Sequence, residues 1–358
     1  MIYYWILLLL ILFLTQTGEN PTSRNRALLL SVFSFFLFFA FRVGFTPDYY
    51  NYEVGFPALH SGRLDVEGRT ELGFQWLCRI LPSYRAVLIV FTLFFCVCIY
   101  IAFKEYIQHK YWSLAFAILF FFTPFVLGNM SGMRSGFVTC FFFLAILAKQ
   151  KYDKTGIFIA LGLIGLAFLF HRSAIGLAPV LFIPGKPFNK YVNFVIYIVV
   201  GAGIYLGFRY ANEINLFALG FAQDVLERRQ YDTYFEEAVE YAFNMNALIK
   251  MGMLLILMYI TLKSSNEEAD NNRSMFLKYT ALLYGLMVMP NNGFVTRFYY
   301  YFAFPCIIGC PYVLSGAKQK RKIVYFSVLC LYMLFQVYVF YKGEVDYFTA
   351  YDNILTPW

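Results

Sequence analysis

Residues 85–103 read RAVLIVFTLFFCVCIYIAF, an apolar run whose one charged residue is the arginine at its start. A membrane-spanning α-helix needs about 20 predominantly apolar residues, because the hydrocarbon core is about 30 Å thick and each residue rises about 1.5 Å. This run therefore predicts a transmembrane helix. Similar runs recur along the chain, in which 60% of 358 residues are hydrophobic and only 14% are charged. With a mean hydropathy of +0.60, a soluble protein is excluded.

The recurring apolar runs predict an all-α, polytopic membrane protein with about 12 spans, forming a single transmembrane domain over residues 1–358. The first span has no basic region or cleavage site before it, so we expect it to be retained. Two short spans, which end at Pro184 and Pro290, are candidates for re-entrant or broken helices. The expected spans are 2–16, 27–44, 85–103, 111–128, 132–148, 156–171, 173–184, 191–208, 246–263, 278–290, 298–316 and 323–342.

The connections between spans alternate between two kinds, of which one is short and basic. The positive-inside rule places this basic set in the cytoplasm. The other set then faces outward with both termini. It holds a first large extracytoplasmic loop over 45–84, a second over 209–245, and the tail from Gly343. The basic residues of the cytoplasmic set are Arg24, Arg26, Lys104, Lys110, Lys149, Lys151, Lys154, Lys186, Lys190, Lys263, Arg273, Lys278, Lys318, Lys320, Arg321 and Lys322.

The two sets differ in which cation they use. Lysine makes up 12 of the 16 cations in the basic set, whereas arginine makes up 11 of the remaining 13. Arginine offers a fixed fork of donors that grips phosphate and keeps its charge when partly desolvated. The outward face is therefore a candidate for phosphate binding. The alternative, pairing with acids of the long loops, accounts for Arg228 and Arg229 but not for all the others.

Cationic or titratable side chains interrupt apolar runs at four places on the predicted outer side: Arg42, Arg134, the pair His171 and Arg172, and Arg297. A charge near the hydrocarbon is costly and usually faces a cavity or a partner. A single arginine near a span end is explained equally well by snorkelling to the headgroups. Four such sites in one leaflet favour a functional site. His171 is the one histidine of three that falls within a span.

The first large loop adds acids and aromatic residues. Asp48, Tyr52 and Glu71 lie in it together with Trp76. Carboxylates accept hydrogen bonds from sugar hydroxyls or act as bases, and aromatic faces cover sugar rings. The alternatives are an interfacial aromatic belt and, for Asp48 and Glu71, ion pairs with Arg42, Arg63 or Arg69.

Other features of the sequence carry less chemistry. Residues 227–241 have the pattern of an amphipathic helix over the membrane, either a wall of a substrate cleft or a solvated cap. Six of the seven cysteines lie in apolar runs and are expected to be small core residues, not disulfides or metal ligands. No spacing of ligands predicts a metal site, and no cofactor is expected. The net charge of +8 forms no nucleic-acid motif.

Five short motifs, in this order, resemble the EpsG family of exopolysaccharide polymerases, which are related in function to Wzy-type O-antigen polymerases. Two departures are Leu72, where the family is associated with proline, and Ser135, where glutamine often follows the arginine. The matching pieces are Arg42 with Gly44 and Asp48-Tyr49-Tyr50-Asn51-Tyr52; Glu71-Leu72-Gly73-Phe74; Asn129 with Met133-Arg134; His171 with Ser173-Ala174; and Arg297 before an aromatic run.

The resemblance implies a metal-independent membrane glycosyltransferase, similar to GT-C type lipid-dependent enzymes, in the bacterial inner membrane. Its substrate would be an oligosaccharide linked to polyprenyl (undecaprenyl) diphosphate, and a chain-length regulator protein is a possible partner. We expect Arg134, Arg172 and Arg297 to stabilise the diphosphate. His171, or else Asp48 or Glu71, is expected to accept the hydroxyl proton, and Arg42 to orient the acidic loop.

Three rival functions remain open at this point. An O-antigen ligase would transfer a finished glycan to another acceptor by the same chemistry. A flippase or transporter of the lipid-linked oligosaccharide would need charges at mid-membrane and pseudo-symmetric halves. A membrane O-acyltransferase would need a polar site that opens to the cytoplasm, and the short, lysine-rich inner connections do not suggest one.

Overall fold

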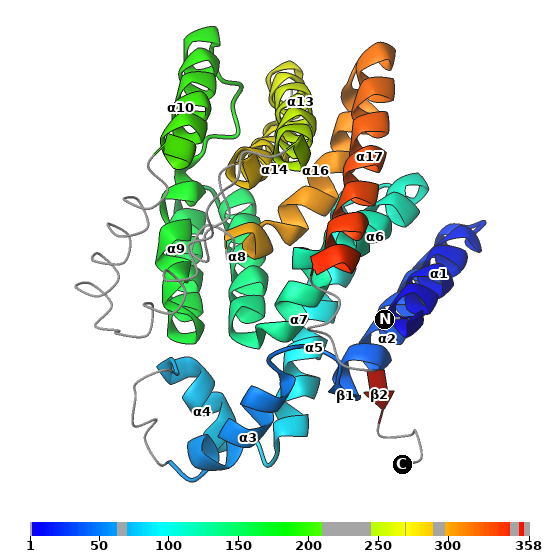
Figure 1. The fold of residues 1–358 in the computed structure, drawn as a ribbon, viewed down its shortest axis with the longest axis vertical. Helices are drawn as coiled ribbons and strands as arrows, with labels where there is room; N and C mark the ends of the chain where they lie inside the picture. Colours follow the sequence, from blue (N-terminus) through cyan, green and yellow to red (C-terminus); the bar gives the residue numbers. More distant parts are fainter. Residues whose placement is uncertain are drawn as a thin grey trace.

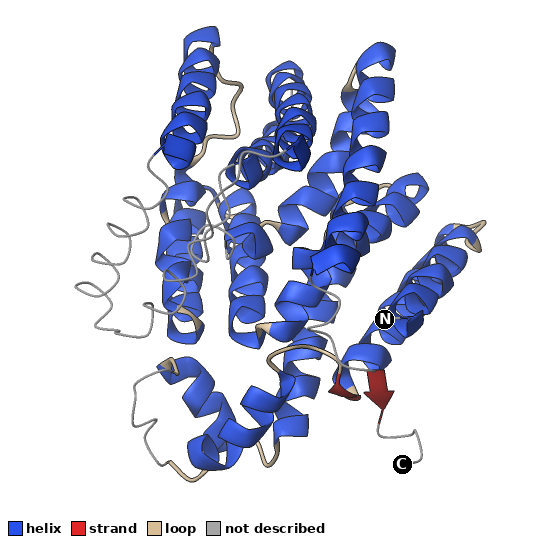
Figure 2. Ribbon diagram, in the orientation of Figure 1, coloured by secondary structure: helices blue, strands red, loops and turns tan. Residues whose placement is uncertain are grey.

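The computed structural model describes residues 2–62, 70–209, 245–268, 270–288, 298–343 and 351–353. Almost all of this part of the chain is helical, and its one sheet is a two-stranded ribbon (Figures 1 and 2). The long helices are α1 (Ile2–Gln16), α2 (Pro21–Ala40), α5 (Tyr84–Ile101), α6 (Trp112–Phe121), α8 (Met133–Lys151), α9 (Asp153–Phe170), α10 (Lys190–Arg209), α13 (Met245–Glu267), α14 (Asn271–Val288), α16 (Ala303–Gly316) and α17 (Gln319–Gly343).

Shorter elements connect the long helices. Two of them, α3 and α4, lie together below the helix bundle in Figure 1, in the region predicted as the first large loop. The shorter elements are β1 (Arg42–Gly44), α3 (Tyr49–His60), α4 (Leu72–Ile80), the π-helical η1 (Ala102–Tyr106), the 3₁₀ turn η2 (His109–Tyr111), the π-helical η3 (Pro124–Gly128), α7 (Asn129–Ser131), the 3₁₀ segments η4 (Arg172–Leu177) and η5 (Pro179–Phe182), and β2 (Tyr351–Asn353).

Five helices of the described chain are long and apolar enough to cross a membrane, and a sixth span results if one bent pair counts as one. Five shorter apolar helices accompany them. These findings confirm an all-α, multi-pass membrane protein, while the count of 12 stays a prediction. The five spans are Pro21–Ala40, Tyr84–Tyr106, Met133–Lys151, Ala247–Glu267 and Gln319–Lys342, and the bent pair is His109–Phe121 with Pro124–Ser131.

Several predicted boundaries were wrong. The span predicted over 27–44 ends at Ala40, and the chain continues as β1. The positive φ angles of Gly44 and Phe45, 64° and 71°, then turn the chain away from a helical path. The helix predicted from 278 begins at Asn271, since its polar first turns lie outside the apolar run. The segment predicted over 173–184 is broken as expected, into η4 and η5.

The span predicted over 111–128 is also broken. Its two parts, α6 and η3 with α7, meet at an angle of 65°. The break falls at Phe122 and Thr123, just before Pro124. Proline lacks the N–H that would continue the helical ladder, and its ring clashes with the preceding turn. The bend carries residues 124–131 across the bundle instead of straight on.

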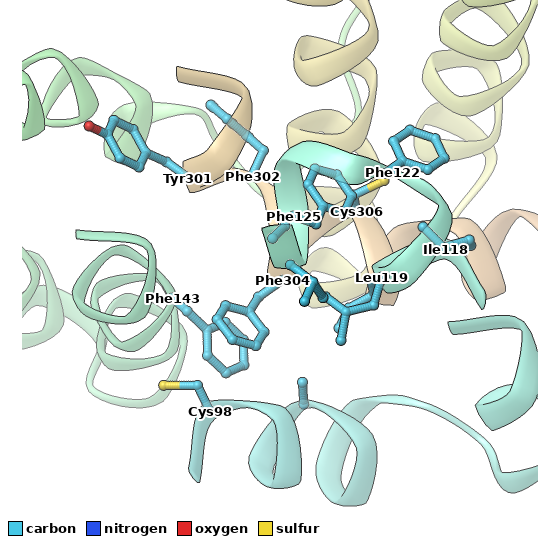
Figure 3. Packing of buried hydrophobic residues seen from close by; sticks show 14 of the residues in the cluster. Cys98, Ile118, Leu119, Phe122, Phe125, Phe143, Tyr301, Phe302, Phe304 and Cys306 are labelled. Carbon is cyan, nitrogen blue, oxygen red and sulfur yellow. The ribbon is translucent and has the colours of Figure 1, made fainter. Parts of the chain in front are cut away.

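The helices pack through aromatic side chains. The ring of Phe304 on α16 stacks on Phe143 of α8 with centroids 4.7 Å apart, and lies 5.2 Å from the ring of Phe95 on α5. Figure 3 shows Phe304 beside Phe143 and Leu119, near Cys98 of α5. All seven cysteines are free, and all but Cys330 are buried, which confirms their role as core residues. This packing fixes α16 against the helices that carry the candidate site.

The two ends of the bundle differ in composition. The basic connections gather at one end, where Lys149 bonds the carbonyl of Ile183 and Lys278 bonds that of Pro184, both at 2.7 Å. We call this the lysine end. At the opposite end, which we call the α3–α4 end, β2 pairs antiparallel with β1 and the ring of Tyr4 lies 6.4 Å from that of Phe45. Tyr4 of α1 and the strand β2, from opposite ends of the sequence, therefore both lie beside residues 42–45 (Figure 1).

Candidate functional site

The break between α7 and α8 is the centre around which the candidate site is built. The side-chain amide of Asn129 donates to the carbonyl of Phe125 at 2.7 Å and to that of Tyr300 at 3.3 Å. Thr139, nearly two helical turns into α8, donates to the Asn129 side chain at 2.7 Å. Gly128 makes room for this contact, because a Cβ there would lie 2.9 Å from the Tyr300 ring. The helical residues 298–301 are thereby fixed against the break.

Arg42 joins the first outer segment to the same break. Its side chain is 1% exposed and donates to the carbonyls of Phe39 and Met130, the latter at 2.7 Å. Arg85 in turn donates to the Arg42 carbonyl at 2.6 Å. A guanidinium buried in this way satisfies the last carbonyls of α2 and ties them to residue 130. These contacts suit the orienting role expected for Arg42.

Asp48 makes a second connection to the break. The hydroxyl of Ser131 on α7 donates to Oδ2 of Asp48 at 3.1 Å, and the backbone N–H of Asp48 donates back to Ser131 Oγ at 3.3 Å. This reciprocal pair positions the start of α3. The Asp48 side chain is half-buried, so its carboxylate lies at the edge of the cluster.

Arg134, in the first turn of α8, forms an ion pair with Glu71 in which Nη1 lies 2.6 Å from Oε2. Its Nε donates to the hydroxyl of Tyr52 at 3.3 Å. The Glu71 side chain is 4% exposed and that of Arg134 is 25% exposed, so the arginine is the more accessible member of the pair. The ion pair expected for Glu71 does exist, and the partner that the structure describes is Arg134, which was not among the three arginines expected. Of those three, Arg63 and Arg69 lie outside the described residues.

Tyr52 presents its phenol to the same guanidinium. Burial raises the pKa of Tyr52 above its ordinary value, and the charge of Arg134 opposes that rise only in part. The phenol is therefore neutral at physiological pH. Because its oxygen accepts from Arg134, its own proton can be donated onward.

His171 ends α9 and caps the 3₁₀ segment that follows. Its Nδ1 accepts a hydrogen bond from the backbone N–H of Ser173 at 3.3 Å and lies 2.7 Å from the Ser173 hydroxyl. That hydroxyl also lies 2.6 Å from the hydroxyl of Tyr301. Since a backbone N–H can only donate, Nδ1 is an acceptor, and the neutral ring carries its proton on Nε2.

Packing brings the histidine segment next to Arg134. Phe137, one turn after Arg134, stacks on Phe170 with ring centroids 4.6 Å apart, and Phe170 directly precedes His171. Gly73, two residues after Glu71, allows a close approach to the same place, because a Cβ there would lie 2.8 Å from the carbonyl of Leu169. The Glu71–Arg134 pair and His171 therefore occupy neighbouring positions at the α3–α4 end. Arg172 begins η4 beside them and is half-buried.

The comparison with protein families identifies the family of the chain. The EpsG family model matches residues 25–353, which is nearly the whole chain. The chain belongs to the EpsG family. This confirms the resemblance drawn from five short motifs, and it points to a polymerase-type role in exopolysaccharide synthesis. None of the curated proteins matches the chain, and no solved structure matches it either.

In this EpsG family member, the structure unites most of the residues chosen from the sequence. Arg42, Asp48, Tyr52, Glu71, Arg134, His171 and Arg172 all lie at the α3–α4 end. Arg297 and the proposed amphipathic helix over 227–241 lie outside the described residues. Within the part that the structure describes, no three His, Cys, Asp or Glu side chains group as metal ligands would.

Sequence reasoning gave no role to four residues that complete the cluster. Ser131 and Arg85 hold the acidic segment, and Ser173 and Tyr301 hold His171. One signal in the sequence could have indicated Ser173. It lies two residues after a histidine that ends an apolar run, and serine is common where helices begin or end. Nothing in the sequence separates Tyr301 from the other tyrosines, of which the chain has 30.

Proposed function

We propose that the protein is a polysaccharide polymerase that transfers a growing glycan from polyprenyl diphosphate onto the terminal sugar of a lipid-linked repeat unit. The observation that carries the proposal is the Glu71–Arg134–Tyr52 cluster, with His171 beside it, in a chain of the EpsG family. Four segments far apart in sequence contribute to it. Such convergence of chemically active side chains is typical of an active site.

The arginines of this cluster suit a diphosphate. A guanidinium presents planar, paired N–H groups that match phosphate oxygens and does not lose its proton. Arg134 is oriented by Glu71 on one side and Tyr52 on the other, so its direction is set before a substrate arrives. We assign Arg134, Arg172 and Arg297 to the charge that develops on the leaving diphosphate. These arginines take the place of a metal ion in the proposal.

The reaction is a single displacement with inversion. The terminal hydroxyl oxygen of the incoming repeat forms a bond to the anomeric carbon of the growing chain. The bond from that carbon to the diphosphate oxygen breaks, and polyprenyl diphosphate leaves with the electron pair. The hydroxyl proton passes to a base. Because the leaving group is already a stable anion, charge stabilisation is the main task of the protein.

The hydrogen bonds of His171 sharpen its role. The proton of the neutral ring is held on Nε2, since Nδ1 accepts from Ser173. His171 is therefore a donor in this proposal, directed to the oxygen of the leaving group, and not the favoured base. Glu71 is committed to Arg134. The base is then Asp48, whose half-buried carboxylate is held by Ser131.

The sidedness of the protein is part of the proposal. The basic connections lie at the lysine end, which the positive-inside rule places in the cytoplasm. The α3–α4 end then faces outward from the bacterial inner membrane, with the cluster near the headgroup depth of a lipid-linked diphosphate. A chain-length regulator protein remains a proposed partner.

The decisive experiment incubates purified protein in detergent with a synthetic oligosaccharide on polyprenyl diphosphate and separates the products by size. A ladder of products is expected. One added unit on a foreign acceptor would indicate a ligase instead, and unchanged substrate would leave transport as the function. The R134A variant, handled identically, is the matched control and should form no ladder.

The carboxylates can be separated in the same assay. Because a base needs its carboxylate, D48N and D48A should both lose the ladder. E71Q keeps a hydrogen-bond acceptor for Arg134, so it should keep more activity than E71A. If D48N forms a normal ladder, Asp48 is not the base.

A further inference from the structure

Helix α4 has two faces of unlike surroundings, although its residues lie in the region predicted to be a loop. Phe74, Gln75 and Cys78 are buried against the rest of the protein. On the opposite face Leu72, Trp76 and Ile80 are 62%, 64% and 75% exposed. These three follow one another at intervals of four residues and so form one apolar stripe along the helix.

The stripe continues an apolar surface of the neighbouring helix. Gly73 lies against the Leu169 carbonyl of α9, so the start of α4 touches the end of that apolar helix. Leu169 is 41% exposed, and Leu166, one turn earlier, is 48% exposed. The exposed apolar side chains at the end of α9 therefore adjoin the start of α4. Since α9 is an apolar helix of a membrane protein, the lipid that surrounds its end also lies next to α4.

The composition of the stripe indicates which layer of a membrane it meets. Trp76 is amphipathic, with an indole N–H beside a large apolar ring, and tryptophan collects at the boundary between acyl chains and headgroups. Arg79 is exposed and lies in the last turn on the same side of the helix as Trp76 and Ile80. An arginine there extends its guanidinium to lipid phosphate while its stem follows the apolar surface.

We propose that α4 is an interfacial helix whose stripe of Leu72, Trp76 and Ile80 is immersed in the bilayer, with Arg79 on phospholipid headgroups. The partner is the phospholipid leaflet at the α3–α4 end. Glu71 directly precedes α4, so the immersed helix also fixes the depth of the Glu71–Arg134 ion pair. This inference does not depend on the proposed polymerase activity.

The test measures the depth of Trp76 in vesicles of phosphatidylethanolamine and phosphatidylglycerol. The wild-type protein and the W76F variant are each reconstituted with brominated phospholipids. The bromine lies either near the glycerol end or near the methyl end of the acyl chains. The difference between the two proteins isolates Trp76 from the three other tryptophans. We expect the difference signal to be quenched more by bromine near the glycerol end, and to resist quenching by iodide in the water.

Two results would overturn the proposal. Strong quenching of the Trp76 signal by iodide, with none by brominated lipid, would show that the stripe faces water. Resistance to both quenchers would show that protein, such as a second copy of the chain, covers it. A second reporter, I80W in the W76F background, should repeat the lipid quenching and guards against a local effect at position 76.

Discussion

The two ends of the bundle both bury cations, but they satisfy them differently. At the lysine end, Lys278 is 2% exposed and its ammonium is surrounded by the carbonyls of Pro184, Gly185 and Lys186. At the α3–α4 end, the guanidinium of Arg134 contacts a carboxylate and a phenol and keeps a quarter of its side chain exposed. The hydrogen bonds of Lys278 to carbonyls only stabilise the fold. The guanidinium of Arg134, which is held in one orientation and belongs to a partly exposed side chain, can also bind a substrate. Burial of a charge alone does not mark a site.

The largest effect is expected at Arg134. Removing one preorganised donor of this kind costs about 10²- to 10³-fold in turnover, so R134A should lose polymer by at least that factor. R134K keeps the charge but not the fork, and should fall between R134A and the wild type. The measurement is the rate of ladder formation per mole of folded protein. Equal rates for R134A and the wild type would show that Arg134, like Lys278, has only a structural role, and that the α3–α4 end does not differ from the lysine end in this respect.

A smaller effect is expected at Ser173. S173A removes the hydroxyl between Tyr301 and His171 but keeps the backbone N–H, so both hydrogen bonds of that hydroxyl are lost. The bond to His171, worth about 1 kcal/mol, is the one that bears on turnover. Turnover should fall by roughly tenfold or less. S173T keeps the hydroxyl and serves as the control. Unchanged turnover in S173A would mean that the serine only caps η4.

The smallest effect on turnover is expected at Lys278. K278M leaves buried carbonyls without a donor, which costs about 1–3 kcal/mol of stability for each one affected. The thermal midpoint of unfolding in detergent should therefore fall, while the turnover of folded protein stays near the wild-type rate. Loss of turnover without loss of stability would show that the lysine end takes part in the chemistry.

The apolar runs by themselves determined most of the helices. The run that opens at Arg85 became α5, and other runs became α8, α13 and α17, because a long apolar segment has no stable alternative to a helix in a membrane. Where the span predicted over 111–128 failed, a single residue with a local backbone preference, Pro124, broke the helix inside an apolar run.

The sequence also indicated which side chains carry chemistry, since a charge in an apolar run needs a reason. Only the tertiary structure decided their partners. Glu71 and Arg134 are 63 residues apart, and Ser173 and Tyr301 are 128 apart. Helix α4 was missed because nine residues are too few for a periodic signal. Its exposed apolar stripe could be recognised only after the structure showed which of its residues are buried. Local propensity and hydropathy act within one segment, whereas a site depends on which segments pack together.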